Sequence, residues 1–516
     1  MKLGIDLGTT RTVVAAAQHG RYPVTCFQVG DALRDFVPGV AALTDAGLVF
    51  GAQAAAESAP RRLLRSIKRI ASRLAPDAPV EGLEVSALEL VTGYLRALRG
   101  ALVGGSNLDL DPHEPLEAMV AVPASANAPQ RYLTLEAFRR AGFEVLGMIN
   151  EPTAAAIEYA HRDLRDLAAR SPKRSVVVYD LGGGTFDASA ISLAGQRFEL
   201  LASEGIAQLG GDDFDFEILA LALDALGIAA DTVDVSRADA LLEACRQAKE
   251  GLGPSSRRLL VDLSELVPGA EPVILRSADL YARCQPFIDR TLECLERLLA
   301  DLPHGGRELA AVYVAGGSAL FPPVLRALRQ RHARKIKVAP LPHAATAVGL
   351  AVAADPDAGV FVREATTRHL GVWREAAGGR EKVFDPIIAK GELPARGGPL
   401  VLERRYTPAH RVGHLRFVEC TRLGAHGEPA GDLTPLDDVL FPYDPRLADR
   451  DLRDHAAERT PDLSGNEIVE TYTCGADGRV SVVIENRTRG YRREYRLGER
   501  AAPPAFSAAI NTGSRD

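Results

Sequence analysis

The chain has 516 residues, too many for one ordinary core, which predicts about two to four domains. Hydrophobic residues make up 46% and charged residues 25%, and the net charge of -7 is spread along the chain, as in a globular protein. Because no basic cluster with interleaved aromatic residues and no long apolar stretch occurs, nucleic acid and membrane are excluded as expected partners.

The chain opens with an apolar strand from Lys2 that ends in an acidic turn, Asp6-Leu7-Gly8-Thr9-Thr10. This early start leaves no room for a signal peptide, so we expect a cytoplasmic protein. Residues 1 to about 36 are predicted to form β-hairpins. From Pro60, apolar residues at spacings of three and four predict a helix that carries Lys68, which by itself is as readily a solvated surface lysine.

A carboxylate, Glu151, is predicted to stand at the end of a strand, where Pro152 starts the next helix. Ligands of α/β sheets bind at the carboxyl edge of the strands, although Glu151 also suits the role of a helix-capping acid. The elements predicted around it are helices at 87–102 and 131–141 and strands at 118–122, which Pro123 ends, and at 145–149.

The most informative stretch is Asp180-Leu181-Gly182-Gly183-Gly184-Thr185-Phe186-Asp187. Three glycines let the backbone approach a ligand and turn its N–H groups towards anionic oxygens, while the flanking Asp and Thr suit a hydrated metal ion. A glycine-rich hairpin turn is the alternative. However, the first turn of the chain, Asp6 to Thr10, repeats the order of apolar strand, Asp-Leu-Gly and Thr. The sequence therefore predicts two related halves that face one nucleotide.

Two more glycine turns follow in the second half, Gly210-Gly211-Asp212 and Gly316-Gly317-Ser318. A strand, a Gly-Gly turn and a helix make a site that a nucleoside can approach closely, although the same string occurs in plain turns. A helix predicted at 238–252 carries Lys249. The other predicted elements are strands at 176–180, 188–193, 198–204, 259–266, 273–275 and 311–315, and helices from 216, at 277–299 and from 323.

Beyond residue 355 the pattern changes to short, period-two runs rich in Val, Leu, Tyr and Arg, which predicts a separate all-β domain. We assign 1–355 to an α/β domain, 356–368 to a linker and 369–500 to a β-sandwich. A charged insertion at 442–466 is expected to be mobile, 501–516 reads as a flexible tail, and no helical domain is expected to follow. Strands are predicted at 382–389, 400–406, 411–421, 468–473, 479–485 and 491–497.

Taken together, these motifs resemble the ATPase domain of the 70-kDa heat-shock (DnaK-type) chaperone family. The resemblance covers 1–355 and implies an actin-like ATPase domain, a duplicated ribonuclease H-like α/β fold in two lobes, followed by an all-β sandwich. It is weaker for the β domain, where it rests on 386–391 and 468–484. The motifs that carry it are Gly4 to Thr10, Ile67-Lys68-Arg69-Ile70, Val120-Ala121-Val122-Pro123-Ala124, Gln130-Arg131, Asn150-Glu151-Pro152, Asp180 to Asp187, Gly210 to Asp215 and Gly316-Gly317-Ser318.

The resemblance implies ATP or ADP as the bound nucleotide, with Mg²⁺ and, as a further candidate ion, K⁺. Lys68 would neutralise charge on the γ-phosphate, and Glu151 would position the attacking water or the metal. Thr185 completes the catalytic set together with Asp187, which would also hold the metal. The residues implied to hold the water shell of Mg²⁺ are Asp6, Asp180 and Asp187.

The resemblance also assigns a relay and a nucleotide-binding set. Pro123 and Arg131 would transmit the nucleotide state to the β domain. The residues implied to bind the nucleotide are Gly8, Thr9, Thr10, Gly182, Gly183, Gly184, Thr185, Gly210, Gly211, Asp212, Lys249, Gly316, Gly317 and Ser318.

Some positions depart from the family's pattern. The family stacks adenine between two arginines, and the corresponding positions here hold Glu250 and Leu320. Lys249 is retained, but Arg246 stands where the family has a ribose-binding Glu. We expect altered base recognition, because each lost cation–π contact is typically worth about 0.5–2 kcal/mol. Gly147 replaces an arginine that contacts J-proteins, so a standard J-domain co-chaperone is not expected.

The expected function is that of a DnaK-like ATP-dependent molecular chaperone, a slow ATP hydrolase whose nucleotide state controls the binding of unfolded or extended polypeptide by the β domain. The alternative is a nucleotide-dependent scaffold or regulator that binds one specific protein partner without general chaperone activity. A small-molecule kinase on the same fold ranks third, because it would leave the β domain unexplained.

Overall fold

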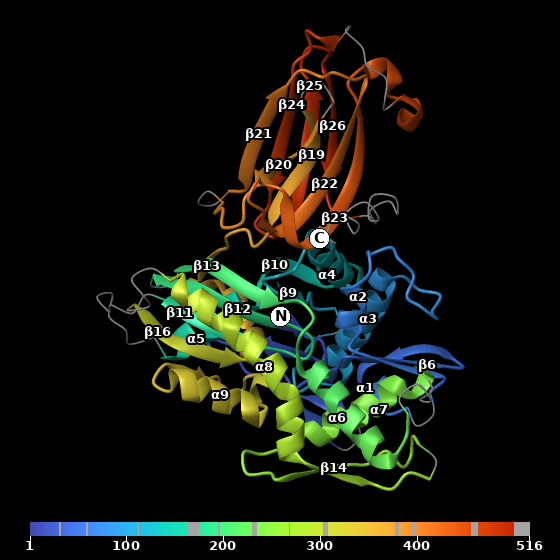
Figure 1. The fold of residues 1–516 in the computed structure, drawn as a ribbon, viewed down its shortest axis with the longest axis vertical. Coiled ribbons are helices and arrows are strands. Elements are labelled where there is room, and N and C mark those ends of the chain that lie inside the picture. The colour runs from blue at the N-terminus through green and yellow to red at the C-terminus, as the bar shows by residue number, and fades with distance from the viewer. Residues whose placement is uncertain are drawn as a thin grey trace. The chain divides into compact units, whose positions relative to one another are not determined.

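The computed structural model describes residues 1–29, 32–57, 60–111, 113–163, 175–194, 197–229, 235–267, 269–302, 308–376, 381–394, 398–455 and 463–499. The chain forms two compact units (Figure 1). The first comprises Met1–Arg73, Glu89–Ser125 and Ala137–Val362, and the second comprises Leu74–Leu88, Ala126–Glu136 and the chain from Arg363 onward. The predicted tail at 501–516 lies outside the described residues.

The first sheet of the first unit begins with the predicted N-terminal hairpin. Strand β1 (Lys2–Leu7) pairs antiparallel with β2 (Arg11–Ala16) and parallel with β9 (Glu117–Val122). Strand β9 in turn pairs parallel with β10 (Glu144–Asn150), and β5 (Val37–Pro38) extends the other edge. The turn from Asp6 to Thr10 therefore joins two central strands.

The second sheet repeats this topology. Strand β11 (Ser175–Leu181) pairs antiparallel with β12 (Phe186–Ala194) and parallel with β16 (Leu309–Ala315), which pairs parallel with β17 (Ile336–Val338). The strand orders are β10-β9-β1-β2-β5 and β17-β16-β11-β12-β13-β18, with β13 at Arg197–Ile206 and β18 at Phe361–Arg363. The glycine-rich loop thus occupies the same place in its sheet as the turn after Asp6 does in the first.

Helices follow the parallel strands of both sheets in the same order. Helices α4 (Ala128–Arg140) and α5 (Glu151–Asp163) follow β9 and β10, and α9 (Pro322–His332) and α10 (Ala345–Ala354) follow β16 and β17. Helices α5 and α10 approach closely because their facing residues are small: a Cβ on Gly349 would overlap the carbonyl of Ala154. The alanine run after Glu151 therefore packs the two halves against each other.

The helix predicted from Pro60 is wrong for its first turn. Residues Arg62–Arg65 form strand β8, which pairs with β6 (Val40–Thr44), and helix α2 spans only Ile67–Ala71. Ser66 separates the two elements with a left-handed backbone, φ 57°. A short apolar run with Leu at consecutive positions fits both the helical and the strand periodicity, and here pairing with β6 makes it a strand. Lys68 nevertheless lies on a helix, as predicted.

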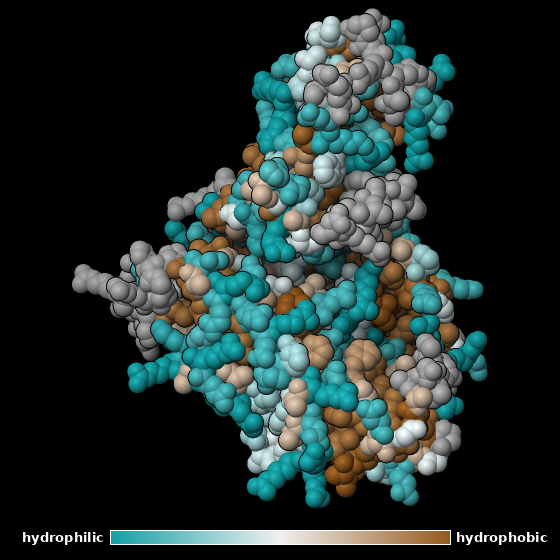
Figure 2. Space-filling view, viewed as in Figure 1, coloured by the Kyte–Doolittle hydropathy of each residue, from teal (hydrophilic) through white to brown (hydrophobic). Residues whose placement is uncertain are grey.

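The remaining elements of the first unit include an outer layer with an exposed apolar face. Phe216 of α6 (Gly211–Leu226) and the cross-strand pair Leu260 and Ile274 of β14 (Arg258–Val261) and β15 (Val273–Arg276) are each more than half exposed. Figure 2 shows apolar surface over this region, low in the view. The other elements are β3 (Phe27–Val29), β4 (Ala32–Arg34), β7 (Gly47–Phe50), α1 (Gly51–Ala55), α3 (Ala87–Gly105), α7 (Val235–Glu250), α8 (Ser277–Ala300), η3 (Gly317–Leu320) and η4 (Pro356–Ala358).

The second unit contains two four-stranded antiparallel sheets, ordered β20-β19-β22-β23 and β21-β24-β25-β26. Their facing sides form one core, to which Phe417 and Phe441 contribute from one sheet and Tyr472 and Val482 from the other. The strands are β19 (His369–Ala376), β20 (Glu381–Ile388), β21 (Leu400–Tyr406), β22 (Val412–Leu423), β23 (Pro429–Pro442), β24 (Ile468–Cys474), β25 (Val480–Asn486) and β26 (Tyr491–Arg496). The predicted β-rich region is confirmed, although β19 and β23 were not among the predicted strands.

The described part of the 442–466 insertion contains two short 3-10 helices, Pro445–Leu447 and Leu452–His455. Leu447, Leu452 and Leu463 are buried, so these parts of the insertion pack on the sheets. Among the described residues, no α-helix follows α10, and no helix is long and apolar enough to cross a membrane.

Candidate functional site

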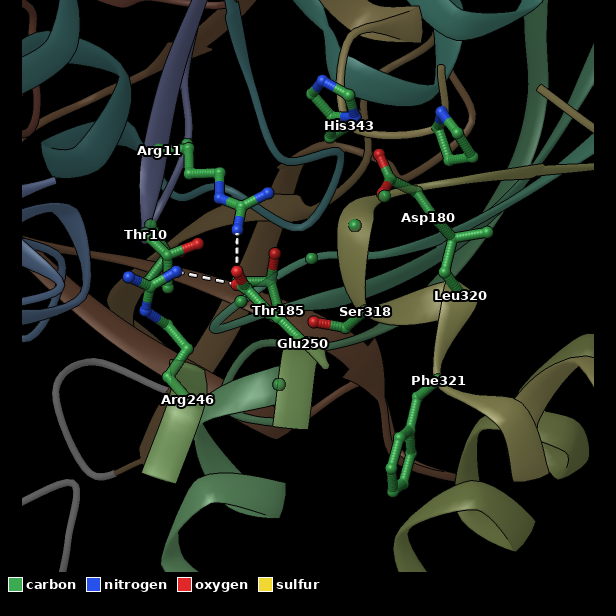
Figure 3. Close-up of a pocket in the computed structure, with 18 of the residues that line it drawn as sticks. Thr10, Arg11, Asp180, Thr185, Arg246, Glu250, Ser318, Leu320, Phe321 and His343 are labelled. Atoms are coloured by element: carbon green, nitrogen blue, oxygen red, sulfur yellow. Dashed lines mark hydrogen bonds and ion pairs between the residues drawn. The ribbon is translucent and has the colours of Figure 1, made fainter. Parts of the chain in front are cut away.

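A pocket of about 330 Å³ lies in the first unit between the two equivalent turns (Figure 3). Its lining comes from both sheets and from α2, α5 and α7. The structure brings fifteen of the predicted site residues together there: Asp6, Gly8, Thr9, Thr10, Lys68, Glu151, Asp180, Gly182, Gly183, Thr185, Gly211, Lys249, Gly316, Gly317 and Ser318.

The two turns pack against each other. A Cβ on Gly183 would lie 2.6 Å from Cγ2 of Thr10, and one on Gly184 would lie 2.9 Å from Oγ1 of Thr9. Only glycine leaves room for this approach, which is why the second loop carries consecutive glycines. The arrangement sets backbone N–H groups and three Thr hydroxyls around one volume, and such groups suit the oxygens of a polyphosphate.

Lys68 and Glu151 form an ion pair at the pocket wall, with Nζ of Lys68 2.5 Å from Oε1 of Glu151. Lys68 comes from the short helix α2 and Glu151 from the first turn of α5, at the end of β10. Burial alone would lower the pKa of Lys68, but the charges of Glu151 and Asp6 raise it above the usual value. Lys68 therefore stays charged although its surroundings are buried.

The carboxylates beside this pair outnumber the cations. Burial and the charge of Glu151 raise the pKa of Asp6 to about 7, against the effect of Lys68. Burial, and then Glu151 and Asp6, raise the pKa of Asp180 well above its usual range. The raised pKa values mean that negative charge on these carboxylates is unfavourable here, and a divalent cation would stabilise their ionised forms.

Among the described residues, the protein side chains alone do not form a complete metal cage at this corner of the pocket. Within the residues that the structure describes, no group of three or more His, Cys, Asp or Glu side chains could hold a metal ion. Mg²⁺ usually retains several water molecules and is bound through one or two carboxylates and substrate phosphates. Asp6 and Asp180 both line the pocket, so their carboxylates are compatible with a hydrated Mg²⁺, and their role in its water shell stays a prediction.

Asp187 is predicted to hold the metal and to belong to the catalytic set. It is 2% exposed, does not line the pocket, and accepts a hydrogen bond from the backbone N–H of Ser125 at 3.3 Å. Burial and the charge of Glu151 raise its pKa to about 7, so it lies within electrostatic reach of the pocket acids.

Three further predicted residues support the glycine loop without lining the pocket: Gly184, Gly210 and Asp212. A Cβ on Gly210 would lie 2.5 Å from the carbonyl oxygen of Gly183. Asp212 is buried and accepts hydrogen bonds from Ser66 Oγ at 2.8 Å and from Arg65 at 3.2 Å. Asp212 therefore ties α6 to the β8–α2 segment that carries Lys68.

The residues predicted for the nucleoside end of the pocket lie where three separate motifs meet. Lys249 Nζ donates to the carbonyl of Gly211 at 2.6 Å and pairs with Asp215 at 2.6 Å. A Cβ on Gly211 would overlap Ser318 Oγ. Asp215, fully buried, also pairs with Arg65 at 2.8 Å, a partner that the sequence pattern did not reveal.

Several lining residues were missed from the sequence. Arg11 directly follows Thr10, and its Nη2 pairs with Glu250, which Arg246 Nη1 also reaches at 2.7 Å (Figure 3). Phe321 and His343 also line the pocket, and His343 Nε2 lies 2.8 Å from Oδ2 of Asp35. The adjacency of Arg11 to the first turn was the one signal available for it.

The proposed relay residues lie away from the pocket lining. Pro123 is buried directly after β9 in the first unit. Arg131 is buried on the part of α4 that belongs to the second unit, where it contacts the turn at Gly478.

Comparison with known proteins gives consistent matches. The Hsp70 protein family model matches residues 113–367. The chain is 32% identical over 384 residues to the chaperone protein HscA homolog of Pseudomonas putida, 31% over 389 residues to that of Chromobacterium violaceum, and 33% over 381 residues to that of Burkholderia cenocepacia. Each match covers 70% of this chain and 58% or 59% of the relative, so the chain spans less than two thirds of the length of these relatives.

Proposed function

The chain belongs to the Hsp70 family, and from that premise we propose that its first unit binds and hydrolyses ATP and that the nucleotide state controls polypeptide binding by the β-rich region. The observation that carries the proposal is the pair of interlocked turns, with Thr9 and Thr10 against Gly183 and Gly184, beside the Lys68–Glu151 ion pair. Phosphoryl transfer depends mainly on positioning and electrostatic stabilisation, and this set supplies both.

The phosphates would be held by the backbone and hydroxyls of the two turns. Thr9 and Thr10 line the pocket from the first turn, and Gly182, Gly183 and Thr185 line it from the second. Asp6 and Asp180 would hold Mg²⁺ through water, and the ion would neutralise phosphate charge. Asp187 is assigned to the same cluster as an outer carboxylate, and K⁺ stays a further candidate ion.

Lys68 and Glu151 would act on the terminal phosphate and the attacking water. The charged Lys68 stabilises negative charge on the phosphate oxygens, and Glu151 fixes the lysine and accepts a hydrogen bond from water. We propose slow turnover, because the pocket contains these positioning groups and an acid that is already paired with lysine.

The first test is single-turnover ATP hydrolysis by the wild type and by Lys68→Ala. The substitution removes the buried cation and is expected to lower the hydrolysis rate by about a hundredfold or more. Lys337→Ala removes an exposed lysine from β17, outside the pocket lining, and serves as the matched control with an unchanged rate. Equal rates in all three proteins, or no hydrolysis by the wild type, would reject an ATPase site.

A second candidate function is a nucleotide-dependent scaffold or regulator for one specific protein partner. One observation favours it: in the described part of the second unit, Val383 and Val401 are the large apolar side chains with substantial exposure. A general binder of unfolded chains needs a broader apolar surface. Binding of many apolar segments in a peptide library supports the chaperone, and retention of a single sequence supports the scaffold.

The proposed binding partners differ between the chaperone and the scaffold. We propose unfolded or extended polypeptide as the ligand of the β-rich region, with one specific protein as the alternative. A standard J-domain co-chaperone is not proposed, because Gly147 stands at the position of the expected contact. A cytoplasmic location is proposed from the sequence alone.

A further inference from the structure

An ion pair crosses the pocket directly beside the first phosphate turn. Arg11 is the first residue of β2, immediately after Thr9 and Thr10, and its partner Glu250 is the last residue of α7 in the second half of the unit (Figure 3). We propose that Arg11 is a contact for the nucleotide phosphates and that Glu250 is an internal anion that occupies Arg11 until a nucleotide displaces it. This inference rests on the proposed nucleotide site.

Arg11 is built to receive an anion at this place. Its guanidinium carbon lies 4.4 Å from the centre of the Phe36 ring, a contact that fixes the side chain over a buried aromatic. Its Nε is buried and has no hydrogen-bond acceptor among the described residues. A guanidinium presents a planar fork of donors that matches phosphate oxygens, and displacement of Glu250 would free Nη2 of Arg11 for such an oxygen.

Glu250 is held loosely enough to be displaced. Its side chain is 41% exposed, and ion pairs with such an exposed partner contribute little net stability. A di- or triphosphate offers more negative charge and more acceptor oxygens than one carboxylate. The phosphates that Thr9 and Thr10 would bind therefore compete favourably for the next side chain along the strand.

Arg246, the second arginine that pairs with Glu250, keeps an acidic partner when Glu250 is neutralised. Arg246 reaches Glu250 at 2.7 Å but also forms an ion pair with Glu243, one turn earlier on α7. Removing the charge of Glu250 therefore leaves Arg246 with an acid and leaves Arg11 without its ion-pair partner. This difference makes Glu243 a matched control, because it is a nearby acid on the same helix that neither lines the pocket nor pairs with Arg11.

The alternative role for Glu250 is direct contact with the nucleoside, since Lys249 and Ser318 lie at the same end of the pocket. The two roles predict opposite changes in nucleotide affinity when the charge of Glu250 is removed. An internal competitor weakens binding of phosphorylated ligands, whereas a nucleoside ligand strengthens binding of adenosine as well. Adenosine, which has no phosphate, therefore separates them.

The experiment is calorimetric titration of the full chain with Mg²⁺-ADP and with adenosine. Glu250→Gln is expected to raise the affinity for ADP by about three- to tenfold, the range expected for one freed charge-assisted contact near solvent. Affinity for adenosine is expected to be unchanged, and Glu243→Gln is expected to leave both affinities within about twofold. In an Arg11→Gln background, the effect of Glu250→Gln on ADP is expected to vanish.

Each other outcome overturns the inference. If Glu250→Gln weakens the binding of both ADP and adenosine, Glu250 is a contact for the nucleoside. If Glu243→Gln raises the affinity for ADP by the same factor, the effect comes from removing any nearby negative charge. A gain that persists without Arg11 also overturns it. If the wild type binds ADP but Glu250→Gln changes nothing, this inference alone fails; if the wild type binds no ADP, the proposed nucleotide site fails with it.

Discussion

Gly316 illustrates how one backbone position supports the acidic corner of the pocket. It follows β16 with φ 81°, and a Cβ there would overlap the carbonyl of Leu181 and lie 2.5 Å from Oδ1 of Asp180. Gly316→Ala is therefore expected to displace Asp180 and to weaken Mg²⁺-ADP binding by about tenfold, since strain of this kind costs about 1–3 kcal/mol. The affinity is measured by calorimetry.

The control is Gly100→Ala in helix α3, where an added Cβ meets no atom within 4 Å. Alanine is the better helix former, so this variant should bind ADP normally and gain up to about 1 kcal/mol of stability. Equal ADP affinities of the two variants would show that the position of Asp180 does not matter for binding.

Asp444 gives the second unit a pH dependence. It is 3% exposed and accepts hydrogen bonds from Arg411 at 2.9 Å and from Arg446 at 2.8 Å. The hydrogen bonds from Arg446, and then from Arg411, lower the pKa of Asp444 below its usual value. A carboxylate whose folded pKa is lowered stabilises the fold above its unfolded pKa of about 3.9 and loses that contribution as the pH falls through the folded pKa.

Asp444→Asn is therefore expected to reduce the urea midpoint of the second unit at pH 7, and its difference from the wild type is expected to shrink progressively as the pH falls below about 4. The fluorescence of Trp373, the single tryptophan of the chain, reports on this unit. A difference that stays constant from pH 7 to pH 3 would contradict the assigned role of the carboxylate.

The sequence predicted the residues whose role is carried by a local motif. Lys68 and Glu151 lie in the pocket at the starts of α2 and α5, and Lys249 lies there at the end of the predicted helix α7. Arg11 and Asp215 were missed because their partners, Glu250 and Arg65, are more than a hundred residues away. No local spacing records such a pairing, since it depends on how the two sheets meet.

At the scale of elements, β23 shows why a strand went unpredicted. Its sequence contains Pro429, Pro435 and Pro442, which argue against a central strand. Among the described strands, β23 is the edge of its sheet and pairs with β22 alone, a place where a missing N–H is tolerated. The edge position could not be read from the sequence.

Strand β19 was missed because its polar residues serve an internal network. Arg374 reaches across to the other sheet and pairs with Glu470, which is fully buried, at 2.6 Å. Tyr406 and Tyr472 also donate to Glu470, each at 2.6 Å. The charged Glu470 thus has partners for both oxygens, and the network joins β19, β21 and β24 inside the second unit.

Glu470→Ala is expected to destabilise the second unit by about 3–5 kcal/mol, because it leaves the guanidinium of Arg374 without its buried partner. Urea unfolding followed by Trp373 fluorescence measures the change. Glu403→Ala is the control: Glu403 also lies in this unit but forms an ion pair with Arg405 in which both side chains are more than two-fifths exposed, worth at most about 1 kcal/mol. Similar losses in the two variants would contradict the network's role.

At the scale of the whole molecule, the prediction of an actin-like fold in two related halves is confirmed. The family match and the repeated sheet order both support it, and the repeat extends from the two Asp-Leu-Gly turns to α5 and α10. The sequence predicted the repeat because short motifs recur in it. The domain limits at 355 and 369 and the roles of the relay residues stay predictions.

The central claim is that a nucleotide in this pocket controls the β-rich region, and limited trypsin digestion of the linker tests it most directly. Arg363 ends β18 within the predicted linker at 356–368, so cleavage there is followed without nucleotide, with Mg²⁺-ADP and with Mg²⁺-ATP, using Lys68→Ala to keep ATP intact. The account predicts a different cleavage rate at Arg363 in each state. The same cleavage rate and fragments in all three conditions would contradict it.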